Sequence, residues 1–162
     1  MTKSGTTSNP IRKRYDIGVV FAIPLPDGRF AYGKQFRDAT VGVYRVVTSK
    51  LIPITQIVGK RFAFHAGLFR LRMGQWPILG LDKFASDEAS WAPACYMEEI
   101  LRPGSFSIYH RGTMRPATPS QVASLDEQVM YSPQGLIERI LSERWASPQT
   151  AKTRISNRRL SR

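Results

Sequence analysis

The chain has few of the residues that build disulfides and metal sites. Among its 162 residues there is one cysteine, Cys95, and there are two histidines, His65 and His110. A single cysteine forms no internal disulfide and no multi-cysteine metal site, a usage typical of a reducing compartment. Neither an HExxH pattern nor a Cys/His cluster accompanies the histidines. We interpret both histidines as packed or rim residues, and we expect no metal and no cofactor.

Long hydrophobic runs are missing as well. No stretch of about 18 apolar residues, the length of a membrane-spanning helix, occurs in the chain. The first residues, MTKSGTTSNPIRKRYD, also lack the hydrophobic segment of a secretory signal. We therefore expect a cytoplasmic protein without membrane insertion.

Motifs for catalysis are equally scarce. Neither the phosphate loop GxxxxGKS/T nor the dinucleotide-binding turn GxGxxG is present. The paired carboxylates Asp87-Glu88 and Glu98-Glu99 are neighbours in sequence, and neighbours on a strand point to opposite faces, so neither pair is set up to share a proton. Cys95 acting as a nucleophile with a histidine base is the remaining alternative, and we favour the interpretation of Cys95 as a small buried apolar residue. The sequence thus indicates a protein that is not an enzyme.

The length and the charge distribution indicate one domain between two basic tails. A chain of this length with 42% hydrophobic residues suits a single core, which we place at residues 15–145. Residues 1–14 and 146–162 are poor in large apolar side chains and contain no acidic residue, so we expect both to be disordered. Nine of the twelve net positive charges lie in these tails, on Lys3, Arg12, Lys13, Arg14, Lys152, Arg154, Arg158, Arg159 and Arg162.

The clearest local pattern is a hairpin over Val20–Gly33, VFAIPLPDGRFAYG. Two alternating apolar runs flank Pro26-Asp27-Gly28. Proline presets a negative φ, aspartate bonds its own backbone and glycine accepts a positive φ, so this tripeptide favours a tight reversal. Val20 and Ala22 are expected on one face of the first strand, together with Leu25, and Phe21 and Ile23 on the other.

The rest of the core has many strand signals and ends in helices. Further strands are expected at 41–47, 61–65, 76–81, 94–98 and 106–110, a short helix at 66–74, and either a helix or a strand at 53–58. Thr118 and Pro119 mark the start of a short helix, and Ser132 and Pro133 begin a longer one that reaches Trp145. We therefore predict a mainly β, α+β fold: a small bent antiparallel sheet or an SH3-like barrel with one or two C-terminal helices.

The aromatic and arginine residues provide candidates for partner binding. Most aromatic side chains are expected in the core, as in other small barrels. Trp91 lies in a polar loop and is the best candidate for an exposed anchor. Arg29, Arg70, Arg72 and Arg111 are the candidates for a positive rim around it.

Several blocks together resemble the bacterial immunity protein 26 family. They are the hairpin VFAIPLPDGRFAYG, GQWPILG at 74–80, FSIY at 106–109 and RPATP at 115–119, in the order of the family pattern. The resemblance spans about Ile17 to Trp145. One departure is the order Asp16-Ile17-Gly18 where the family commonly has Gly-Asp, and the basic charge is another. The resemblance implies a small, mainly β cytoplasmic protein encoded beside a polymorphic toxin system.

Two functions therefore compete. The resemblance implies binding and neutralisation of a cognate protein toxin. The alternative is a nucleic-acid-binding protein whose tails contact phosphate through Arg12, Lys13, Arg14, Lys152, Arg154, Arg158 and Arg159 while a barrel offers aromatic rings for stacking. A third interpretation is association of the tails with ribosomal, phage or membrane surfaces by charge alone.

Overall fold

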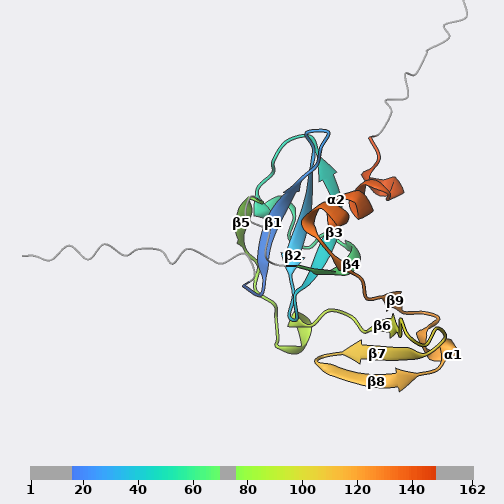
Figure 1. Ribbon diagram of the computed structural model, residues 1–162. Coiled ribbons are helices and arrows are strands. Elements are labelled where there is room, and N and C mark those ends of the chain that lie inside the picture. The colour runs from blue at the N-terminus through green and yellow to red at the C-terminus, as the bar shows by residue number, and fades with distance from the viewer. Residues whose placement is uncertain (1–15, 70–75, 149–162) are drawn as a thin grey trace, which may run out of the picture.

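The strands of the chain divide between two sheets, one above the other in the view of Figure 1. The computed structural model describes residues 16–69 and 76–148. Arg70, Arg72 and almost all of both predicted tails lie outside these ranges. The mainly β, α+β class expected from the sequence is confirmed. The division of the strands between two sheets was not anticipated.

The large sheet has six strands in the order β10-β4-β3-β2-β1-β5. Its strands are β1 (Val19–Pro24), β2 (Phe30–Gln35), β3 (Thr40–Thr48), β4 (Phe62–Leu68), β5 (Ile78–Leu81) and β10 (Met130–Tyr131). Neighbouring strands run antiparallel, except that β10 is parallel to β4.

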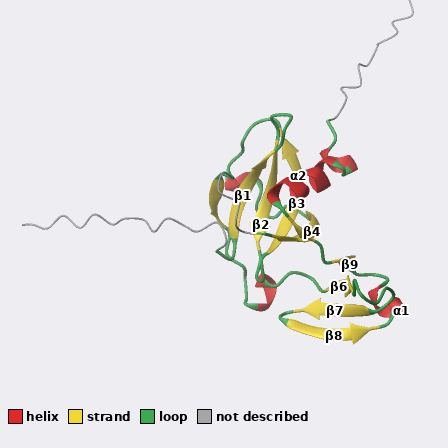
Figure 2. Ribbon diagram, in the orientation of Figure 1, coloured by secondary structure: helices red, strands yellow, loops and turns green. Residues whose placement is uncertain are grey.

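The small sheet has four strands in the order β8-β7-β6-β9. They are β6 (Cys95–Glu98), β7 (Phe106–His110), β8 (Thr113–Ala117) and β9 (Asp126–Glu127), and β9 is parallel to β6. Two α-helices, α1 (Pro119–Val122) and α2 (Pro133–Leu141), and the 3-10 turns η1 (Ile54–Gln56), η3 (Glu88–Ser90) and η4 (Arg144–Ala146) complete the fold. Figure 2 shows α1 beside the small sheet and α2 against the large one.

The predicted hairpin forms as β1 and β2. Val20 pairs with Lys34 and Pro24 with Phe30 across the reversal. As expected, Val20 and Ala22 contribute to one apolar cluster and Phe21 and Ile23 to another; Leu25 joins the second, on the opposite face from the one expected. The large sheet is therefore buried on both faces.

Helix α2 covers one of these faces. Ser132 caps it by accepting a hydrogen bond from the Gly135 amide, and Pro133 occupies the first turn, as the sequence predicted. Leu136 and Ile140 are fully buried against Phe21 and Ile23 in the same cluster. The apolar stripe of the helix is thus what attaches the C-terminal part of the chain to the sheet.

Four local predictions need correction or completion. The helix expected from residue 66 is wrong where it can be compared, because β4 continues to Leu68; the rest of that stretch, 70–75, is outside the described residues. Strand β8 was not among the strands expected from the sequence. The open choice at 53–58 resolves as the 3-10 turn η1. Ala146, at the start of the predicted C-terminal tail, is 1% exposed and packs in the core.

We expect the α2 contact to dominate the stability of the C-terminal part. Ile140→Ala removes a fully buried side chain and should lower the free energy of unfolding by about 2–4 kcal/mol. Leu141→Ala is the matched control, because Leu141 is partly exposed and its loss should cost less than about 1 kcal/mol. Urea denaturation followed by circular dichroism measures both, and equal losses would contradict this packing.

Candidate functional site

The turn between β2 and β3 has an unusual backbone that is held from several sides. Asp38 and Ala39 have backbone φ values of 55° and 57°, which residues other than glycine rarely adopt. The buried Gln35 amide donates to the carbonyls of Phe36 and Thr40, at 2.7 and 3.1 Å, and the Phe36 amide donates to Thr40. Strained backbone persists only where its surroundings determine it, and such sites are often functional.

This turn positions Arg37 over Trp91. The Arg37 guanidinium lies 5.5 Å from the centre of the Trp91 ring. Its Nε donates to Ser90 Oγ at 2.6 Å, its terminal nitrogen pairs with Asp87, and its backbone amide donates to the Ser90 carbonyl. Because Asp87 precedes the 3-10 turn η3 and Ser90 is its last residue, the three contacts hold the loop that carries Trp91 against the β2–β3 turn.

The turn between β7 and β8 approaches the same tryptophan from the small sheet. Arg111 has a φ of 50° and is followed by Gly112 with a φ of 78°. A Cβ on Gly112 would stand 3.6 Å from the Trp91 ring. Asp38, Ala39 and Arg111 are the non-glycine residues with positive φ in the described part of the chain, and all three lie at or beside this one place. The strain of the structure is therefore concentrated around Trp91.

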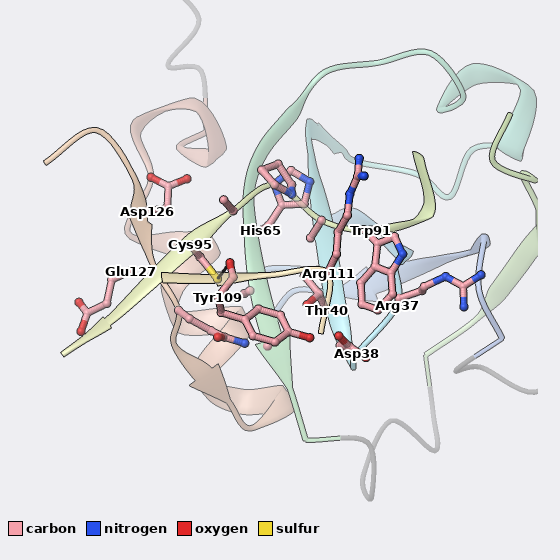
Figure 3. A pocket seen from close by; sticks show the side chains of 16 residues that line it. Arg37, Asp38, Thr40, His65, Trp91, Cys95, Tyr109, Arg111, Asp126 and Glu127 are labelled. Carbon is pink, nitrogen blue, oxygen red and sulfur yellow. Dashed lines mark hydrogen bonds between the residues drawn. The ribbon is translucent and has the colours of Figure 1, made fainter. Parts of the chain in front are cut away.

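A cleft between the two sheets results. It consists of a narrow cavity of about 40 Å³ and an open hollow of about 560 Å³, and the two share His65, Trp91 and Arg111 among their lining residues. In Figure 3, Arg37, Trp91 and Arg111 stand at one end of the narrow part, and Asp126 and Glu127 of β9 stand at the other. One end of the narrow part is thus aromatic and carries both signs of charge, because Asp38 lies there with the two arginines, and the other end is acidic.

The open hollow is lined by packed aromatic rings. Phe36 contacts Phe62, His65 and Phe84 with ring centres 5.4, 5.1 and 4.8 Å apart. Lys34 is only 5% exposed, yet its charge is compensated: Nζ lies 2.7 Å from an Asp82 carboxylate oxygen and 3.8 Å from the centre of the Phe84 ring. These packed rings offer apolar surface for contact with a partner, and the Lys34 charge beside them is already paired.

The candidate catalytic groups line the cleft, and their surroundings disfavour the thiolate form of Cys95. Burial lowers the pKa of the His65 imidazole, against an opposing influence of the Asp126 charge. Burial also raises the pKa of the Cys95 thiol, and Asp126 raises it further. A nucleophilic cysteine needs a lowered pKa. Among the described residues no group of His, Cys, Asp and Glu is arranged to hold a metal ion.

The structure brings together two of the five predicted partner-binding residues. Trp91 and Arg111 line the cleft, Trp91 half-buried and Arg111 exposed. Arg29 precedes β2, at the end of that strand opposite the cleft. Its side chain pairs with Asp27 and donates to the Ala146 carbonyl at 2.6 Å, which ties down the C-terminal segment. Arg70 and Arg72 lie outside the described residues, as do the tail residues proposed for nucleic acid.

Sequence reasoning missed Arg37, the residue that positions Trp91. It follows β2 in the segment Arg37-Asp38-Ala39, which contains neither the glycine nor the proline that usually marks a turn. The available signal was weak: a single aspartate, which tolerates a positive φ better than most residues.

Comparison with known proteins gives one family. The family model for immunity protein 26 matches residues 16–103. These residues include β1 to β6, the β2–β3 turn and the loop with Trp91. The blocks at 106–109 and 115–119 that also suggested the family, and the expected extent to Trp145, lie beyond the match. No curated protein and no solved structure matches the chain significantly.

The burial of His65 predicts a pH-dependent stability. The folded state holds the pKa of this imidazole below its ordinary value of 6.5, so the unfolded chain binds more protons below that pH. This contribution is fully present above pH 6.5 and is lost as the pH falls through the folded pKa, with a slope below about 1.4 kcal/mol per pH unit. His65→Gln should flatten this part of the profile, measured by urea denaturation from about pH 7.5 to about pH 5.5. The control is His110→Gln, on an exposed residue; parallel profiles of wild type and His65→Gln would contradict the assignment.

Proposed function

Since the chain belongs to the immunity protein 26 family, we propose that it binds and neutralises a cognate bacterial toxin domain in the cytoplasm. Proteins of this family are generally non-enzymatic. No helix in the described part of the chain is long and apolar enough to span a bilayer. Neutralisation by occupying the toxin surface fits a protein whose only cysteine has a raised pKa and is therefore held in the thiol form.

The single observation that carries the docking site is the fixed position of Trp91 between two sheets. Tryptophan and arginine dominate binding energies at protein interfaces. Here Arg37 holds the ring from the large sheet and the Arg111-Gly112 turn meets it from the small sheet. A side chain that is already ordered loses little conformational freedom on binding, so more of the contact energy appears as affinity.

The charges of the cleft suggest how the toxin is oriented. The described residues contain thirteen basic and twelve acidic side chains, so this part of the chain has almost no net charge to steer a partner from a distance. Local charge remains: Arg111 at one end of the cleft, beside Asp38 and the Arg37–Asp87 ion pair, and Asp126 and Glu127 at the other. A toxin surface that places an acidic group at Arg111 and a basic group at Asp126 and Glu127 can dock in one orientation only.

We expect the full chain to rescue growth of cells that express the toxin domain encoded beside its gene. Trp91→Ala should weaken binding at least about tenfold, because it removes the anchor. Arg111→Glu should slow association at low salt, whereas Arg144→Glu, a charge reversal on an equally exposed arginine of η4, should not. Isothermal titration calorimetry and stopped-flow mixing measure affinity and rate, and thermal unfolding verifies each variant's fold.

Different results would refute the immunity function and the docking site. A wild-type chain that neither binds the toxin domain nor rescues growth refutes the immunity function. A chain that rescues growth and keeps its affinity in Trp91→Ala and Arg111→Glu refutes the cleft as the docking site.

A nucleic-acid-binding role is the second candidate, favoured by the nine basic residues within 1–14 and 146–162. Binding by phosphate contacts releases counterions and falls steeply with salt. If this role holds, single-stranded RNA should bind the full chain at about 50 mM salt, and at least about 100-fold less at about 200 mM salt. Removal of residues 1–14 and 149–162 should abolish the interaction in fluorescence anisotropy. Binding that resists both changes would contradict a role of the tails.

A further inference from the structure

The tip of the β6–β7 hairpin exposes two large aliphatic side chains next to each other. Ile100 is 94% and Leu101 is 93% exposed, while other large apolar side chains on the surface of the described part are at most 57% exposed. Single exposed apolar residues are normal on protein surfaces. An adjacent, almost fully exposed pair is different, because contiguous apolar surface marks contact sites.

The tip that carries this pair is built rather than loose. The Glu99 amide donates to the Ser105 carbonyl at 2.9 Å. Within the turn, the Arg102 amide donates to the Glu99 carbonyl and the Ser105 amide donates to the Arg102 carbonyl. Glu98 Oε1 accepts from the Gly104 amide at 2.7 Å, and Glu99 pairs with Arg102 at 2.9 Å. These hydrogen bonds fix the backbone of the tip, and the Ile100 and Leu101 side chains extend from it into solvent.

The tip stands at the edge of an apolar hollow on the small sheet. Met97 of β6 and Met114 of β8 line this hollow of about 400 Å³ together with Ile100 and Leu101. We call these four residues the apolar notch. Met97 lies two residues along β6 from Cys95, and Met114 is the register partner of Tyr109, so both share the sheet face on which Cys95 and Tyr109 line the cleft. The notch and the cleft are therefore parts of one continuous surface.

We propose that the apolar notch binds an apolar side chain from a basic segment of the toxin domain. This inference rests on the proposed immunity function and adds a second contact region to it. Two methionines allow the notch to adapt to the shape of the entering side chain. Glu98 and Glu99 line the same hollow; Arg102 balances the charge of Glu99, and the net negative charge that remains complements lysine or arginine residues next to that side chain.

The same carboxylates disfavour the other occupants. A membrane surface rich in anionic lipid would meet Glu98 and Glu99 with like charge. A second copy of the chain, joined notch to notch by a two-fold axis, would bring its own Glu98 and Glu99 against this pair. A partner of opposite charge avoids both costs.

The double variant Ile100→Ser with Leu101→Ser tests the proposal. Since each side chain is over 90% exposed, the thermal unfolding temperature of the free chain should not fall. Binding to the toxin domain encoded beside the gene should weaken by about 100-fold in calorimetry, the value expected when two aliphatic side chains no longer become buried. Leu51→Ser is the control, because Leu51 is 47% exposed and lies before η1, outside the notch and the cleft.

A charge variant tests the chemistry of the partner. Glu99→Lys should slow association severalfold at low salt, and the difference should shrink as salt is added, if the entering segment is basic. Faster association would overturn the basic character of that segment.

The remaining outcomes separate this inference from the immunity function. If the wild-type chain binds and Trp91→Ala weakens binding, but the double variant binds like wild type, the notch proposal is overturned and toxin binding stands. If wild type does not bind at all, the immunity function falls and the notch proposal with it. Dimerisation in light scattering, or binding to anionic vesicles, that the double variant abolishes would also overturn the proposal.

Discussion

The segment 126–131 holds the two sheets together, and the cleft depends on it. At its start, Asp126 and Glu127 pair in parallel with Cys95 and Tyr96 of the small sheet, and the Gln128 amide donates to the Tyr96 carbonyl at 2.8 Å. At its end, Met130 and Tyr131 pair in parallel with Gly67 and Leu68 of the large sheet. One short extended stretch therefore satisfies backbone groups in both sheets and sets the distance between them.

The Met130 side chain packs over Gly67 at this junction. A Cβ at Gly67 would overlap the Met130 sulfur, so a larger residue there would require the partly exposed methionine side chain to move. On the other side of the cleft the Arg37 amide donates to the Ser90 carbonyl at 3.0 Å. The cleft is thus bounded by two backbone attachments, and Trp91, beside the second, cannot move far without breaking one.

The sequence predicted the parts of this structure that local chemistry determines. Pro26-Asp27-Gly28 specifies its reversal, and Ser132-Pro133 and Thr118-Pro119 specify helix starts, because each acts on its own neighbours in the chain. The parallel pairs of β9 and β10 involve two residues each and follow from no periodicity. Trp91 and Arg111 were singled out by residue type alone. Arg29 was expected at the partner-binding rim and Arg37 was not singled out, because only tertiary contacts distinguish a stacked arginine from one that ties down a chain end.

The two candidate contact regions contribute to binding in different ways. Arg111 and Glu99 carry charge at the surface, and such charges act mainly on the rate and orientation of encounter. Trp91 and the pair Ile100-Leu101 offer apolar area, whose burial acts mainly on the lifetime of a complex. The net charge of +12 comes mostly from residues 1–14 and 146–162, and the described part of the chain is almost neutral, so the two contact regions themselves contribute little long-range attraction. Their contribution to the proposed binding is therefore expected in the dissociation rate. The backbones of both turns are fixed by hydrogen bonds before a partner arrives, so little conformational entropy is lost when one binds.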